Sequence, residues 1–164
     1  MPVFKLFDQK GFTFPELVIV MGVVAMLFGL VTFNLLKTQN KADVSSGVQT
    51  LVSDMKTQQG KAMMGVANQN NPSSYGIYFE NNKYTLFRGT TYVAGDPSNF
   101  VVILSENMEF SSIAFPNTTL AYLAGSGEVR DFTSGSDSLT LRNKSSGDQK
   151  TVTVNKYGVI TAVN

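Results

Sequence analysis

The sequence predicts an α+β protein. We expect a long N-terminal helix, membrane-spanning in its first half and amphipathic in its second half, packed on an all-antiparallel β head of two small sheets. Three observations lead there: an uncharged apolar run at residues 17–36, apolar residues at helical spacing as far as residue 66, and an alternating pattern after residue 74. The expected segments are residues 1–11, 12–36, 37–68 and 69–164.

The apolar run contains no charged side chain over its 20 positions. As a helix it would be about 30 Å long, which matches the hydrocarbon core of a bilayer. A removable signal peptide would have an apolar region of only about 7–15 residues, followed by a small-residue cleavage site. Here the residues KTQNK follow at positions 37–41. We therefore expect a retained single span, and the long polar remainder that follows it is expected outside the cytoplasm.

The next stretch, residues 37–68, has the pattern of an amphipathic helix with one face on a soluble domain. Its apolar positions recur at three, four or seven residues: Val44, Val48, Leu51, Met55, Ala62 and Val66. The pair Met63 and Met64 is expected to fill the core. The turn-forming sequence NQNNPSS, at residues 68–74, is expected to end the helix.

The rest of the chain reads as short strands. Residues 75–80 and 83–88 alternate with a period of two, and Asn81-Asn82 between them predicts a two-residue hairpin. Further strands are expected at residues 100–104, 108–115, 120–123, 128–132, 138–142, 151–155 and 158–163. Strands at this spacing indicate a β globule of two small sheets.

The composition lowers the expectation of enzyme chemistry. The chain has 164 residues and a net charge of +1, with neither cysteine nor histidine. The commonest general base near neutral pH, the commonest zinc ligand and any thiolate site are therefore missing. We expect neither an enzyme nor a cofactor.

The residues just before the apolar run carry the most specific signal. They read Lys10-Gly11-Phe12-Thr13-Phe14-Pro15-Glu16. This junction resembles the prepilin peptidase site of type IV pilins and type II secretion pseudopilins. The resemblance implies that residues 1–11 are a leader cut after Gly11, that Phe12 becomes the N-methylated N-terminus, and that Glu16 acts in processing and assembly.

Glu16 is also unusual on physical grounds. Ionisable groups within membrane segments are costly and usually have a partner. Cleavage after Gly11 would create an α-amine at Phe12, one helical turn before Glu16, on the same or a neighbouring subunit. The resemblance implies the neighbouring subunit. The alternative interpretation is an interfacial glutamate that reaches water and has no function.

The order of elements is similar to that of the GspH/FimT group of minor pseudopilins and minor pilins. This similarity implies a structural subunit of a type IV pilus or type II secretion pseudopilus in the inner membrane. The implied partners are other pilin or pseudopilin subunits, the prepilin peptidase/methyltransferase, the inner-membrane assembly platform, and the lipid bilayer before assembly. Two alternatives stay open: a major pilin of the same machinery, or an anchored β domain that binds a ligand and never polymerises.

The head offers few other candidate sites. The acidic residues Glu128, Asp131 and Asp137 match no calcium-loop motif, so no metal site is predicted. Some FimT-like minor pilins bind DNA, but the C-terminal cations here are few and interleaved with Asp148. Nucleic acid is therefore a possible partner that the sequence does not support.

Overall fold

The structure, a computed structural model, describes residues 11–65, 67–68 and 71–164. It confirms the α+β class, with helix α1 (Phe14–Met63), a short 3₁₀ helix η1 (Pro116–Thr118) and two antiparallel four-stranded sheets. The chain forms two compact units with a boundary between Thr38 and Gln39. The expected leader at residues 1–11 lies, apart from Gly11, outside the described residues.

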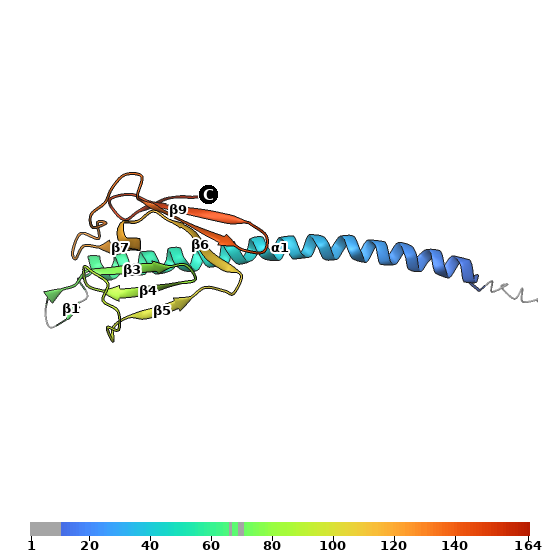
Figure 1. The fold of residues 1–164 in the computed structure, drawn as a ribbon, viewed down its shortest axis with the longest axis horizontal. Helices are drawn as coiled ribbons and strands as arrows, with labels where there is room; N and C mark the ends of the chain where they lie inside the picture. The colour runs from blue at the N-terminus through green and yellow to red at the C-terminus, as the bar shows by residue number, and fades with distance from the viewer. Residues whose placement is uncertain (1–10, 66, 69–70) are drawn as a thin grey trace, which may run out of the picture. The chain divides into compact units, whose positions relative to one another are not determined.

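Both sheets belong to the second unit (Figure 1). The first sheet has the order β5-β4-β3-β7, with β3 (Tyr75–Glu80), β4 (Lys83–Arg88), β5 (Phe100–Ile103) and β7 (Thr119–Tyr122). The second sheet has the order β10-β9-β8-β6, with β6 (Met108–Ile113), β8 (Ser138–Asn143), β9 (Gln149–Val154) and β10 (Ile160–Val163). A two-stranded ribbon of β1 (Ala67–Asn68) and β2 (Asn71–Pro72) precedes them.

The first hairpin has the predicted register. Tyr75 lies opposite Arg88 and Glu80 lies opposite Lys83, so Asn81-Asn82 forms the two-residue connection. Asparagine is favoured in such tight turns because it tolerates positive φ. The alternating pattern of this region therefore specified both strands and their pairing.

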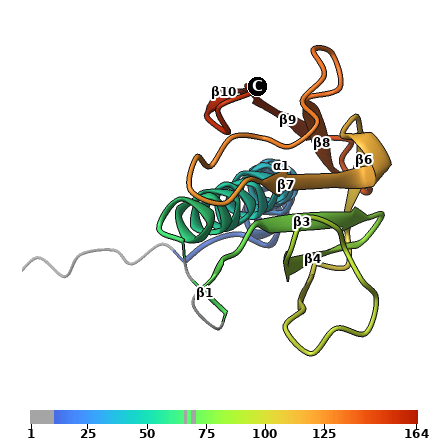
Figure 2. The same cartoon turned by 90° about the vertical axis from the view of Figure 1, so that its left-hand side faces the viewer.

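The core of the second unit joins α1 to both sheets (Figure 2). Five of the six predicted helical core positions are buried, and the sixth, Val66, lies outside the described residues. The five are Val44, Val48, Leu51, Met55 and Ala62. They belong to one buried cluster with side chains of both sheets, including Ile77 and Phe79 of the first and Leu139 and Val152 of the second.

The end of the helix differs from the prediction. Helix α1 ends at Met63, earlier than residue 68, and Gly65 follows with φ of 60°. A residue in this left-handed conformation commonly terminates a helix, and glycine adopts it without steric cost. The prediction that Met63 and Met64 fill the core is wrong, because their side chains are 53% and 75% exposed.

The strand predicted at residues 128–132 is also absent from the described part of the chain. Only an isolated bridge between Val129 and Tyr122 forms there. Asp131 has a φ of 54°, which takes the backbone out of the extended region. The segment therefore leaves the strand direction after one bridge.

Candidate functional site at the start of helix α1

The start of α1 is built from a few residues that surround the predicted cleavage site. Gly11, Phe12 and Thr13 are exposed and precede the helix, which begins at Phe14. The N–H of Leu17 donates to the carbonyl of Thr13 at 3.1 Å and closes the first turn. Pro15 is the second helical residue, where its missing N–H leaves no helical hydrogen bond unmade.

Glu16 has a local hydrogen-bond partner. Its Oε2 accepts hydrogen bonds from the backbone N–H of Thr13 at 2.8 Å and from the Thr13 hydroxyl at 2.7 Å. The carboxylate thus reaches back to the residue that precedes the helix, as in a capping box. Negative charge in the first turn also interacts favourably with the helix dipole.

Thr13 is the residue that sequence reasoning missed. The order Thr13-Phe14-Pro15-Glu16 fits the capping-box pattern of a Ser or Thr followed three positions later by Glu or Gln. That pattern predicts a helix start at Phe14. The predicted residues Gly11, Phe12 and Glu16 line one shallow hollow, and Thr13 completes it.

The fold itself places no steric demand for glycine at position 11. A Cβ added there would meet no atom within 4 Å. Phe12 is 84% exposed, so the peptide bond between the two residues is not covered by the described chain. Among the described residues, nothing therefore requires glycine at position 11.

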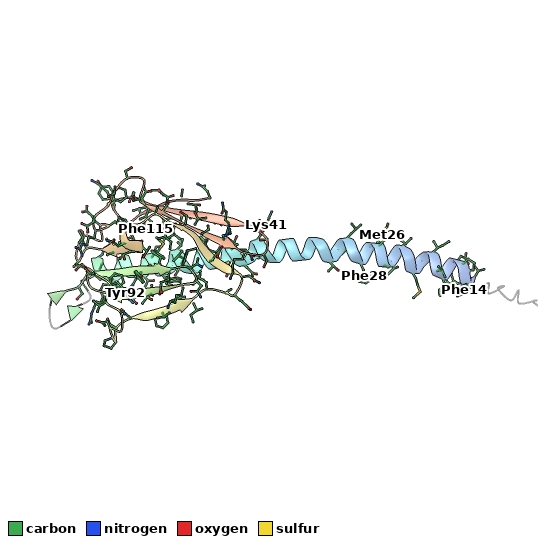
Figure 3. The ribbon with its side chains drawn as sticks, in the orientation of Figure 1. Phe14, Met26, Phe28, Lys41, Tyr92 and Phe115 are labelled. Carbon is green, nitrogen blue, oxygen red and sulfur yellow. The ribbon has the colours of Figure 1, made fainter. Side chains whose placement is uncertain are left out.

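The helix that follows has the length and composition needed to cross a bilayer. The span Phe14–Thr32 has a mean hydropathy of 2.3, and none of it is buried within the chain. Met26 and Phe28 project from opposite sides of α1 (Figure 3), and both are exposed. A core helix of a soluble protein would be mostly buried, so this apolar surface lacks the protein cover that such a helix has.

The head shows little chemistry of its own. Among the described residues, no group of three or more acidic, histidine or cysteine side chains is placed to hold a metal ion. Asp131 pairs with Arg130 at 3.1 Å, and Arg142 pairs with Glu109. The Arg142 pair further reduces the free positive charge near the C-terminus.

Two tyrosine phenols in the head have raised pKa values. Burial, together with a 2.6 Å hydrogen bond to Asp54, raises the pKa of the Tyr84 phenol above its ordinary value. Burial alone raises the pKa of Tyr122. A tyrosine phenol is already neutral in the physiological range, and both shifts move its ionisation to still higher pH.

Comparisons with known proteins give no further assignment. No family model matches the chain, and no curated protein or solved structure matches it.

Proposed function

We propose that this chain is a structural subunit, a minor pilin or pseudopilin, of a type IV pilus or type II secretion pseudopilus. A prepilin peptidase would remove residues 1–11, and methylation would follow at Phe12. The subunit would wait in the inner membrane with its head outside the cytoplasm. An assembly platform would then move it into a filament in which the apolar helices of neighbouring subunits pack together.

One observation carries the proposal. The exposed Gly11-Phe12 junction lies just before the 19-residue apolar span Phe14–Thr32, which has Glu16 in its first turn and is not buried by the described residues. Burying exposed apolar surface is worth roughly 25 cal/mol per Å². Lipid before assembly and neighbouring helices after assembly would each supply such an environment.

The charge of Glu16 fits the same scheme. In the intact chain the carboxylate is held by Thr13. Cleavage would add an α-amine at Phe12, and in the dry centre of a filament an opposite charge would interact with Glu16 much more strongly than in water. The capping contact would then hold the carboxylate at the helix start until a neighbouring amine arrives.

The decisive test is processing of Gly11 variants. The full chain is expressed in membranes with a prepilin peptidase, and the precursor is separated from the shorter product by blot. Gly11→Leu should accumulate as precursor, whereas Gly22→Leu should be cut like the wild type. Gly22 is a matched control because a Cβ added there also meets no atom within 4 Å.

Mass spectrometry of the product gives the second readout. A methylated Phe12 at the new N-terminus is expected. An intact Met1 in the presence of active peptidase would overturn the proposal and favour an anchored β domain that does not polymerise. Abundance in sheared filaments would separate a major pilin from a minor one.

A further inference from the structure

Strand β5 forms an unprotected sheet edge. The two four-stranded sheets have four edge strands, and three of them carry a feature that hinders pairing with an additional strand. A bridge from Val129 to Tyr122 flanks β7. The ladders of β6 and β10 contain register shifts, between residues 110 and 112 and between residues 160 and 162. Natural proteins use such interruptions to prevent pairing with another strand.

The backbone of β5 is regular and free on its outer side. It pairs with β4 without a register shift. The N–H of Leu104 donates to the carbonyl of Asn82 at 3.0 Å. Bonded and non-bonded pairs alternate along an antiparallel ladder, so Val101 and Ile103 direct their N–H and C=O groups away from β4. Across the described residues, no backbone hydrogen bond from another segment reaches these two.

The side chains of β5 are apolar and largely uncovered. The strand reads FVVI, without charge or proline. Phe100 is 65% exposed and Ile103 is 75% exposed. An open edge with apolar side chains provides what a bound extended peptide needs: main-chain partners for affinity and alternating side-chain contacts for specificity.

The two ends of β5 differ in charge. A hollow at the Phe100 end is lined by α1 and β4 residues that include Lys61 and Arg88. A second hollow, at the Ile103 end, is lined by residues that include Asp43 of α1. The Phe100 end therefore holds two cations with Asp96 nearby, and the Ile103 end holds Asp43, with Lys83 opposite Ile103 and paired with Glu80.

The two cations at the Phe100 end have different surroundings: Lys61 Nζ lies 5.9 Å from the centroid of the Tyr75 ring, and Arg88 lies near Asp96. Neither Lys61 nor Arg88 belongs to a salt bridge in the part of the chain that the structure describes. Hydrogen bonds from the hydroxyl and backbone N–H of Ser98, at 2.5 and 2.8 Å, lower the pKa of Asp96, and the charge of Arg88 adds a smaller contribution.

These features define the direction of an added strand. All pairs in this sheet are antiparallel, and an added antiparallel strand would run opposite to β5. Its C-terminal end would lie beside Lys61 and Arg88, and its N-terminal end beside Asp43. We propose that the β5 edge binds the extended C-terminal segment of a partner polypeptide, with the terminal carboxylate held by Lys61 and Arg88.

This interaction does not rest on filament assembly, since a chain that never polymerises has the same edge. The test therefore measures binding alone. The full chain in detergent micelles is titrated against the fluorescent peptide KTVTVTV with a free C-terminal carboxylate, and separately against the same peptide with a C-terminal amide. Saturable binding of the acid is expected, with the amide about tenfold weaker because one charge-assisted contact is lost.

Variants separate the main-chain contribution from the charge. Val101→Pro removes an outward N–H without removing a bond to β4, and it should abolish binding, whereas Val101→Thr should retain it. The double variant Lys61→Gln with Arg88→Gln should bind acid and amide equally. Lys56→Gln, an exposed change elsewhere on α1, should behave as the wild type. Circular dichroism and the thermal midpoint show whether each variant is folded.

Three results would overturn the proposal. One is no saturable binding of the acid peptide at millimolar concentration. Another is equal affinity of the wild type for acid and amide. The third is a concentration-dependent dimer, lost in Val101→Pro, together with no peptide binding, which would make a second copy of this chain the occupant of the edge.

Discussion

The charge of Glu16 can be separated from its role in the helix start by two substitutions. Glu16→Gln keeps a side-chain acceptor for the Thr13 N–H, because glutamine also serves at this position of a capping box. It removes the negative charge. Thr13→Val has the opposite effect, since it removes the hydroxyl that donates to Glu16 at 2.7 Å and leaves the carboxylate charged.

The two roles differ in expected magnitude. A capping interaction contributes about 1 kcal/mol to helix stability, which is roughly a fivefold effect. Breaking an ion pair in a dry protein interior by removing one partner costs about 3–5 kcal/mol. If Glu16 pairs with a neighbouring α-amine, Glu16→Gln should therefore lower assembly by about 150-fold to 5,000-fold. Thr13→Val should lower it by no more than about fivefold.

The assay compares filament yield per processed subunit. Each variant is expressed with the complete assembly machinery, and the sheared filament fraction is measured against processed protein in the membrane by blot. This normalisation removes differences in cleavage. The assembly role of the charge is refuted if Glu16→Gln assembles like the wild type, or if Thr13→Val is impaired as severely as Glu16→Gln.

Two further predictions concern the head. Leu51→Ala should lower the free energy of unfolding by about 2–5 kcal/mol in a urea titration, because Leu51 is fully buried in the core. Leu27→Ala, on the exposed apolar span, should leave the unfolding transition of the head unchanged. Equal effects of the two substitutions would contradict the packing. The raised pKa of Tyr84 means that the folded state disfavours the phenolate, so its contribution to stability is complete below the unfolded value of about pH 10 and is lost as pH rises beyond it. Urea unfolding at pH 8 and pH 11 should show a smaller alkaline loss for Tyr84→Phe than for the wild type, and an equal loss would exclude Tyr84 as a cause.

The sequence predicted the fold correctly in segments where apolar residues recur with one period, either helical or alternating. The stripe from Val44 to Ala62 repeats at helical spacing because one face of α1 meets both sheets. In the Tyr75–Glu80 and Lys83–Arg88 strands, Ile77, Phe79 and Tyr84 pack in the core from one face of the hairpin, although Thr85 and Phe87 are buried as well. In both regions local pattern and tertiary burial agree, which is the condition under which sequence reasoning succeeds.

The wrong predictions fall in segments where the local sequence pattern does not indicate which parts of the fold pack against them. Met63 and Met64 are apolar, but they fall at the end of α1, beyond the packed stripe, and so remain exposed. Residues 128–132 have strand-like composition, yet the backbone turns at Asp131. Among the site residues, Gly11, Phe12 and Glu16 were nominated from the junction, and Thr13 could have been found from its spacing to Glu16 alone.

The joint core of α1 and both sheets has a consequence for the order of folding. Val44 and Leu51 emerge from the ribosome about 100 residues before Val152, with which they share one core. Contacts between segments so far apart in the chain form slowly, because a long loop must close first. The apolar stripe of the helix is therefore expected to stay exposed to water until β8 and β9 have been synthesised. A chaperone that shields nascent chains would protect this intermediate from aggregation.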